Sequence, residues 1–174
     1  MKTIARFLPG DAIIRLQCVI IVVVALVFSA LLGSRFFSVA NFQSIGSQLP
    51  ILGMLAFGMG MTMLTGGINL SIIAGANACS LVMAAIIVTH PDNPLFLVLA
   101  LLAGAAVAVA IGTLNGALIA WVGVSPILAT LGTMTLISGL NILLSNGTVI
   151  SGFPTAIQYL GNATIAGIPV ALLL

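Results

Sequence analysis

The stretch Leu49–Val88 reads LPILGMLAFGMGMTMLTGGINLSIIAGANACSLVMAAIIV, two apolar runs separated by the pair Gly66-Gly67. It holds no charged residue, and its polar residues follow the glycine pair, first at Asn69 and Ser71 and then at Asn77 and Ser80. Each run is long enough to cross a bilayer as a helix. The stretch therefore predicts two transmembrane helices joined by a polar turn.

The composition of the whole chain indicates the same environment. Of its 174 residues, 61% are hydrophobic and only 3% are charged, and the mean hydropathy is +1.38. A soluble domain carries about 25% charged residues. The expected fold class is all-α: a polytopic integral membrane protein with about five transmembrane helices plus the start of a sixth, in a single transmembrane domain over residues 1–174.

The apolar runs set the expected spans. These are Leu16–Gly33, Leu49–Thr65 with Pro50 in its first turn, Ile68–Thr89, Leu95–Val122 and Ile127–Leu144, with a sixth helix from Ile165. Ser34–Ser47 is expected as an outer connection and Ser145–Thr164 as an irregular outer segment. The residues after Ile165 are too few to span a bilayer, which favours a truncated chain.

The cations are confined to the N-terminal part. Lys2, Arg6 and Arg15 precede the first apolar run, and Arg35 follows it. The positive-inside rule then places the N-terminus in the cytoplasm of a multi-pass protein of the bacterial inner membrane. Nucleic-acid binding needs several clustered cations, so the sequence excludes nucleic acid as a partner.

Catalytic chemistry has few candidate residues. Between Phe36 and Leu174 the charged or readily titratable side chains are His90 and Asp92, which fall in a turn with two prolines. Acid–base or nucleophilic catalysis needs at least two convergent ionisable groups. We therefore predict no catalytic residue, no metal site and no cofactor, and we interpret His90 and Asp92 as parts of a solvated loop.

Neutral hydrogen-bonding residues within the spans are the candidate substrate pathway. Asn69, Asn77 and Ser80 are expected on one face of the third helix, and Thr130, Thr133 and Asn141 on one face of the fifth. The whole predicted set is Thr65, Asn69, Ser71, Asn77, Asn115, Thr130, Thr133 and Asn141. Such a lining suits a neutral polyhydroxylated solute such as a sugar. Interhelical packing is the alternative. Gly112 and Gly116, spaced as GxxxG, predict close helix packing.

Several ordered motifs resemble permease subunits of bacterial ABC sugar importers of the ribose, xylose, arabinose and galactose type. Residues 58–71, GMGMTMLTGGINLS, resemble a segment ending in T-G-G-I-D-L-S. Residues 112–119, GTLNGALI, are similar to G-x-x-N-G-x-L-I, and residues 124–133, VSPILATLGT, to V-x-P-F-I-A-T-L-G-T. Phe36–Phe42 and Gly167–Val170 resemble two further family segments. The resemblance covers about the N-terminal half of a family permease.

The resemblance implies transport by alternating access with three kinds of partner in the lipid bilayer. These are a cytoplasmic ABC ATPase subunit, a periplasmic solute-binding protein and a second permease subunit, in a homo- or heterodimer. The chain departs from the family pattern at Asn69, where Asp is usual, at Ile73, where Gly is usual, and at Ser138, where Arg is frequent. The alternatives are a sodium-coupled carrier half, a channel-like subunit, or a non-functional truncated permease.

Overall fold

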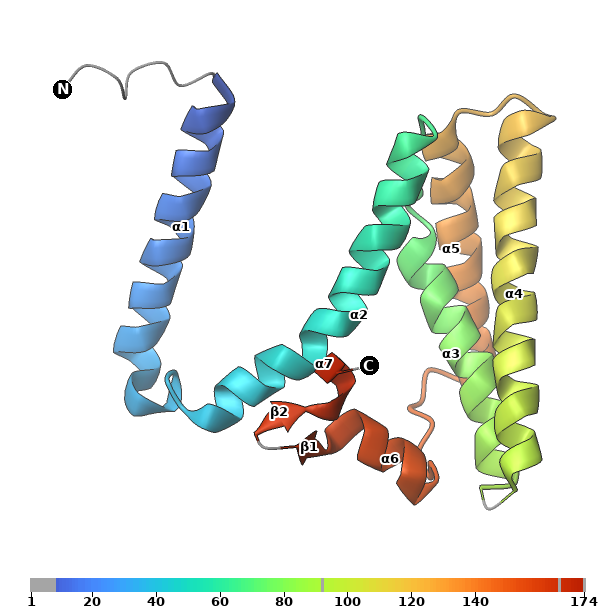
Figure 1. The fold of residues 1–174 in the computed structure, drawn as a ribbon. Helices are drawn as coiled ribbons and strands as arrows, with labels where there is room; N and C mark the ends of the chain where they lie inside the picture. Colours follow the sequence, from blue (N-terminus) through green and yellow to red (C-terminus); the bar gives the residue numbers. More distant parts are fainter. Residues whose placement is uncertain (1–8, 92, 166, 174) are drawn as a thin grey trace. The chain divides into compact units, whose positions relative to one another are not determined.

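A computed structural model describes residues 9–91, 93–165 and 167–173. The chain divides into two compact units, with the boundary between Gly46 and Ser47. Each unit is treated by itself below (Figure 1).

The first unit consists of α1 (Pro9–Leu32), the short 3-10 helix η1 (Gly33–Arg35) and the start of α2 (Val39–Leu64). Ser38 stands just before α2, and its hydroxyl accepts a hydrogen bond of 3.2 Å from the Asn41 N–H. The Asn41 side chain donates to the Phe36 carbonyl oxygen at 2.8 Å. These bonds fix the point at which the chain turns from η1 into α2.

The start of α2 corrects two sequence expectations. Ser34–Ser47 was expected to be a connection, but the helix already begins at Val39, and Pro50 lies inside it instead of in its first turn. Polar residues in this segment suggested a loop. They do not stop a helix whose first turn is capped by Ser38, and a proline removes only one backbone donor from its interior.

The second unit is built around three helices, α3 (Ile72–Thr89), α4 (Pro94–Ala120) and α5 (Pro126–Ser145), of which α4 runs antiparallel to the other two (Figure 1). Helix α3 packs along both α4 and α5. The packed faces carry small residues, including Ala74, Ala100 and Ala129, which are buried. At Gly104 an added Cβ would lie 2.6 Å from the Met83 sulfur. Small residues thus allow the helices to approach closely, as is usual inside a membrane.

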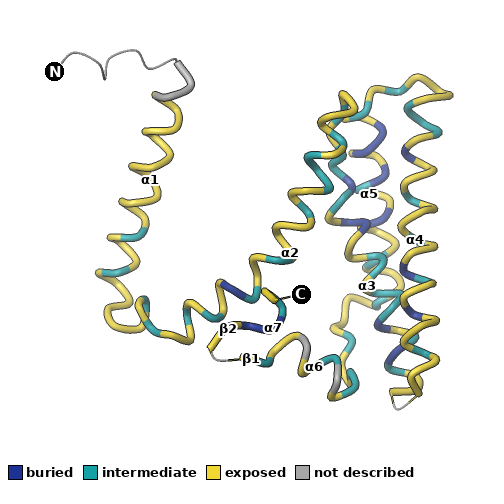
Figure 2. Tube along the Cα trace, in the orientation of Figure 1, coloured by how far each residue is buried: buried dark blue, intermediate teal, exposed yellow. Residues whose placement is uncertain are grey.

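The outer helix faces carry the large apolar side chains. Figure 2 shows that burial in this unit follows the seams between α3, α4 and α5, while their remaining surface is exposed. Within the described residues, each of the five helices α1 to α5 is long enough and apolar enough to cross a membrane. The prediction of an all-α polytopic fold with five spans is therefore confirmed.

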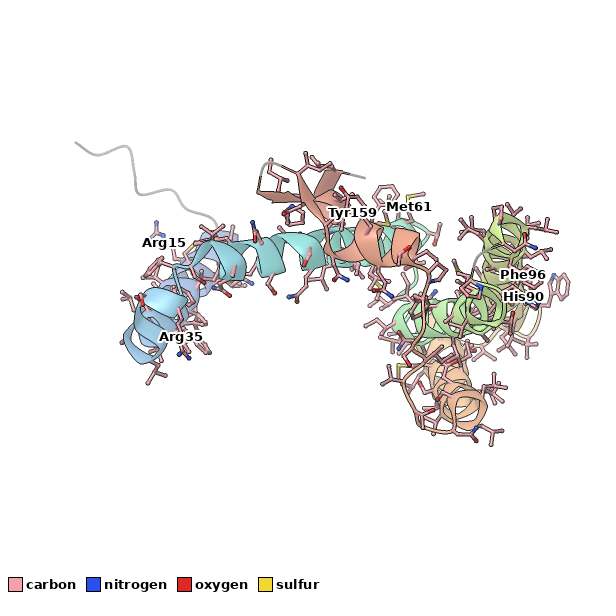
Figure 3. All side chains as sticks on the ribbon, turned by 90° about the horizontal axis from the view of Figure 1, so that it is seen from below. Arg15, Arg35, Met61, His90, Phe96 and Tyr159 are labelled. Atoms are coloured by element: carbon pink, nitrogen blue, oxygen red, sulfur yellow. The ribbon has the colours of Figure 1, made fainter. Side chains whose placement is uncertain are left out.

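The turn between α3 and α4 is short and capped. The Asn93 side chain accepts a hydrogen bond of 3.0 Å from the Leu95 N–H, and Pro94 occupies the first helical position. The His90 ring stacks on Phe96 with a centroid distance of 4.1 Å (Figure 3). Since His90 is exposed, its position in a solvated turn agrees with the sequence interpretation. Asp92 lies outside the described residues.

The segment after α5 also differs from expectation. Within the predicted irregular region Ser145–Thr164, residues Thr155–Asn162 form α6. Strands β1 (Thr164–Ile165) and β2 (Ile168–Pro169) then pair antiparallel, with Thr164 opposite Pro169. Helical structure resumes in α7 (Val170–Leu173), not at Ile165. Gly167 has a φ of +85°, a conformation that interrupts an apolar run that hydropathy alone would extend.

Candidate functional site

The candidate site begins with a backbone break between α2 and α3. Gly66 has a φ of +88°, which turns the chain after α2. An added Cβ at Gly67 would lie 2.9 Å from the Pro126 Cβ, so this glycine allows the turn to pack against the start of α5. The chain stays non-helical until Ile72. The break lies at the same end of the bundle as the α4–α5 loop (Figure 1).

Thr130 of α5 supplies hydrogen bonds to this broken backbone. Its hydroxyl oxygen accepts from the Leu70 N–H at 3.1 Å. The hydroxyl also lies within donating distance of the Ile68 carbonyl oxygen, at 3.1 Å, and of the Pro126 carbonyl oxygen, at 2.7 Å. Non-helical backbone is tolerated inside a membrane protein where the protein satisfies its polar groups. Thr130 performs that role here and is only 2% exposed.

A chain of three polar side chains continues from the break to α4. The Ser71 hydroxyl donates to Asn69 Oδ1 at 2.7 Å, and the Ser71 N–H donates to the same oxygen at 3.0 Å. On the other side, Asn115 Nδ2 donates to Ser71 Oγ at 2.9 Å. We call the hydrogen-bonded side chains of Asn69, Ser71 and Asn115 the polar partition.

The polar partition contains one unsatisfied group. Asn115 Oδ1 is enclosed by protein and has no hydrogen-bond partner within the described part of the chain. Leaving a buried acceptor unpaired costs about 1–3 kcal/mol. Such groups are rare in folded proteins, and each one calls for a structural or functional explanation.

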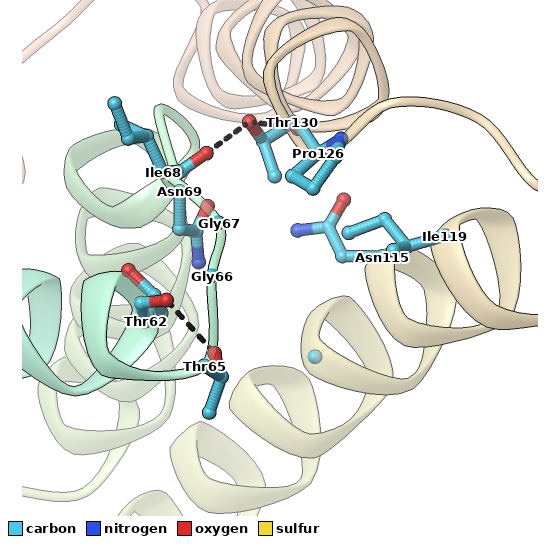
Figure 4. A pocket seen from close by; sticks show the side chains of 11 residues that line it. Thr62, Thr65, Gly66, Gly67, Ile68, Asn69, Asn115, Ile119, Pro126 and Thr130 are labelled. Atoms are coloured by element: carbon cyan, nitrogen blue, oxygen red, sulfur yellow. Dashed lines mark hydrogen bonds between the residues drawn. The ribbon is translucent and has the colours of Figure 1, made fainter.

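Two cavities adjoin the polar partition. The first has a volume of about 310 Å³ and also reaches Thr62, Thr65 and Ile119 (Figure 4). The second has a volume of about 320 Å³ and extends towards Met54, Cys79 and Ala108. Asn69, Gly112 and Asn115 line both cavities, and Ser71 lines the second, so the two cavities adjoin at the polar partition.

The structure gathers most of the predicted pathway residues at these cavities. Those lining at least one of the two are Thr65, Asn69, Ser71, Asn115 and Thr130. Thr133 is buried in α5, and its hydroxyl donates to the Ala129 carbonyl oxygen at 3.0 Å. It therefore packs within the helix seam.

Asn77 and Asn141 belong to a different place. They line a separate cleft of about 530 Å³ with Ser80, Ser145 and Thr148. Asn141 Nδ2 also donates to the Ala74 carbonyl oxygen at 3.1 Å, which joins α5 to α3. The expectation that Asn69 shares a helical face with Asn77 and Ser80 is wrong, because Asn69 precedes the helix and turns its side chain to Ser71.

Sequence reasoning missed two features of the site. Thr62 lines the first cavity from the last turns of α2, and Thr65 donates to its carbonyl oxygen at 2.8 Å. The packing of Gly67 on Pro126 was also missed. The spacing of Thr62 and Thr65 on one helical face could have indicated the first feature. The second joins residues far apart in the sequence and gave no local signal.

The glycine pair Gly112 and Gly116 makes no close approach within the described chain. An added Cβ at either position meets no atom within 4 Å. Gly112 lines the two cavities, and Gly116 lines a groove on α4 that ends at Trp121. The role of Gly112 and Gly116 in helix packing therefore stays a prediction, since no described helix contacts α4 closely at either glycine.

Comparison with known proteins identifies relatives across nearly the whole chain. The autoinducer 2 import system permease protein LsrC of Salmonella paratyphi B is 30% identical over 168 residues, covering 97% of this chain and 46% of the relative. The ribose import permease protein RbsC of Bacillus subtilis is 34% identical over 149 residues, covering 84% and 45%. The chain thus spans about half the length of these relatives. No solved structure matches it.

The family comparison covers the site itself. Residues 41–166 match the model of the family described as "Branched-chain amino acid transport system / permease component". That range contains the backbone break, the polar partition and both cavities. Together with five membrane-spanning helices, the match shows that this chain is a multi-pass membrane protein and belongs to the family of ABC transporter permease components.

Proposed function

We propose that the chain provides part of the membrane path of an ABC importer for a small, neutral, polyhydroxylated solute of the monosaccharide class. The observation that carries this proposal is the pair of cavities around the polar partition. Each has a volume of just over 300 Å³, near the lower limit of about 300 Å³ for small-molecule sites. That size favours a solute as small as a monosaccharide.

The lining supports a neutral solute. Among the described residues, the hydrogen-bonding side chains of the two cavities come from Thr, Asn, Ser and Cys, and no lining residue carries a charge. Hydroxyl and amide groups can exchange hydrogen bonds with sugar hydroxyls. An ionised solute would lose its hydration without gaining an opposite charge. The name of one relative, the ribose import permease of Bacillus subtilis, agrees with this class.

The energy for uphill transport comes, in this proposal, from a partner. Helices α2 to α5 contain no Asp, Glu, Lys, Arg or His. Intramembrane proton relays use such residues. We infer that a cytoplasmic ABC ATPase drives the cycle, that a periplasmic binding protein delivers the solute, and that a second permease subunit completes the path.

Orientation follows from the charge distribution. With the N-terminus in the cytoplasm, α2 runs inward and the Gly66-Gly67 turn lies at the cytoplasmic end of the bundle. The first cavity would then be the inner one. The inner bacterial membrane is the compartment in which such a permease meets both a cytoplasmic ATPase and a periplasmic protein.

One alternative has structural support. Non-helical backbone lines the coupling-ion sites of sodium-driven carriers, and the non-helical residues Gly66, Gly67, Ile68 and Asn69 line the first cavity. Co-purification with an ABC ATPase and uptake of D-ribose that requires ATP would support the importer. Uptake that follows a sodium gradient without ATP would instead establish the carrier.

A further inference from the structure

We propose that the polar partition is a gate between the two cavities and that Asn115 selects for hydroxyl-bearing solutes as the gate opens. The proposal rests on the proposed function only in taking the solute to be hydroxylated. In this proposal Asn115 helps to close the connection between the two cavities and also favours solutes that carry hydroxyl groups.

The partition is closed in this structure. Ser71 is 1% exposed and Asn115 is 5% exposed. Their side chains are joined to each other and to Asn69 by hydrogen bonds of 2.9 and 2.7 Å. Asn69 and Asn115 lie in the walls of both cavities, so a solute that passes from one cavity to the other between these two side chains separates at least one of these bonds.

In the closed state, the buried Asn115 Oδ1 lacks a hydrogen-bond donor among the described residues, while the amide nitrogen of the same side chain donates to the Ser71 hydroxyl oxygen. When the polar partition opens, the Asn115 amide nitrogen separates from Ser71. A solute hydroxyl could then donate to Asn115 Oδ1 and accept from this amide nitrogen. A methyl group of similar size offers neither bond. Opening is therefore favoured by a hydroxyl group and not by an apolar group.

Space for the movement lies one helical turn away. Gly112 and Asn115 are three residues apart on α4, so they share a face of the helix, and side chains of helices lean towards the N-terminal turn. An added Cβ at Gly112 would meet no atom within 4 Å. The space beside Gly112 is therefore free of other described side chains, and the Asn115 amide is proposed to move into it.

Cys79 provides a native reporter for reagents that reach the second cavity beside the polar partition. It lines the second cavity and is not among the residues that line the first. A methanethiosulfonate reagent modifies such a thiol: the thiolate attacks the sulfenyl sulfur, a disulfide forms, methanesulfinate leaves, and the thiol proton passes to water. The 2-hydroxyethyl and n-propyl reagents differ only in a terminal hydroxyl or methyl group.

The experiment compares the two labelling rates in the Cys18→Ser chain held in lipid nanodiscs, by intact mass spectrometry. We expect Asn115→Leu to lower the ratio of the 2-hydroxyethyl rate to the n-propyl rate roughly fivefold, as loss of one net hydrogen bond implies. Thr113→Val is the matched control, since the Thr113 hydroxyl donates within its own helix to the Val109 carbonyl oxygen at 2.8 Å. Its ratio should not change.

An unchanged ratio in Asn115→Leu, or an equal fall in Thr113→Val, would overturn the proposal. Ser71→Ala is a second variant that keeps Asn115 and removes the link to it, so both labelling rates should rise while the preference for the hydroxyl reagent remains. No rise in either rate would also contradict a gate. These measurements need neither ATPase nor transport, so their failure is distinct from failure of the proposed importer function.

Discussion

The Thr130 hydroxyl accepts a hydrogen bond from the Leu70 N–H at 3.1 Å, across 60 residues of sequence. This contact secures non-helical backbone beside a cavity. Without it, the half-buried Leu70 N–H would lose the acceptor that α5 supplies. The site therefore depends on α5 as much as on the segment that carries its asparagines.

Replacing Thr130 by valine should loosen the backbone break. Valine keeps the branched shape but removes the hydroxyl, so the Leu70 amide should exchange its hydrogen with solvent faster, and the free energy of unfolding should fall by about 1–3 kcal/mol. Hydrogen exchange with mass spectrometry measures the first effect. Thr135→Val is the control, because Thr135 is exposed and bonds only within α5. Equal effects in the two variants would contradict this role for Thr130.

Gly67→Ala should destabilise the turn. The new Cβ would lie 2.9 Å from the Pro126 Cβ, and overpacking of this kind typically costs about 1–3 kcal/mol. Unfolding in a mixed-detergent titration would measure the loss. At Gly60, inside α2, an added Cβ meets no atom within 4 Å, so Gly60→Ala should be neutral or slightly stabilising. A Gly67→Ala protein as stable as the wild type would show that this contact is not needed.

Ser71→Ala should weaken the joint between α3 and α4. The change removes the acceptor of the Asn115 amide and one of two donors to Asn69 Oδ1. We expect a lower unfolding free energy, by about 1–3 kcal/mol, in the same titration. Ser80→Ala provides a comparison, because Ser80 is exposed and bonds only to the Asn77 carbonyl oxygen of its own helix. Similar losses at both positions would argue against a special role for Ser71.

Asn69→Leu should reduce uptake without abolishing folding. The side chain lines both cavities and is only partly buried, so an apolar residue there removes a polar group from the proposed path, while the Thr130 hydrogen bonds to the backbone break remain. Uptake of radiolabelled D-ribose, normalised to the amount of protein in the membrane, should fall severalfold. Unchanged uptake would assign Asn69 to packing alone.

Hydropathy and glycine placement predicted the membrane class and the five spans, because apolar runs of this length have few alternatives in any protein. The beginning of α2 could not be predicted in the same way. Asn41 and its polar neighbours suggested a loop, and only the cap at Ser38 shows that a helix begins at Val39. Local capping hydrogen bonds decide where such helices begin, and a hydropathy profile carries no information on these bonds.

The candidate site was predicted in its residue types and only partly in its arrangement. Asn69, Ser71 and Asn115 were named from their polarity within apolar sequence. Their connection requires α3 and α4 to pack side by side, since the bond between Asn115 and Ser71 spans 44 residues. The helical period also placed Asn69 with Asn77, which is wrong because the backbone break resets that period before Ile72.

The most direct test of the importer is uptake of D-ribose into proteoliposomes that contain the protein with an ABC ATPase that co-purifies with it. The account predicts uptake that requires enclosed ATP, persists without a sodium gradient and falls severalfold in Asn69→Leu. Uptake that proceeds without ATP and follows a sodium gradient would contradict it.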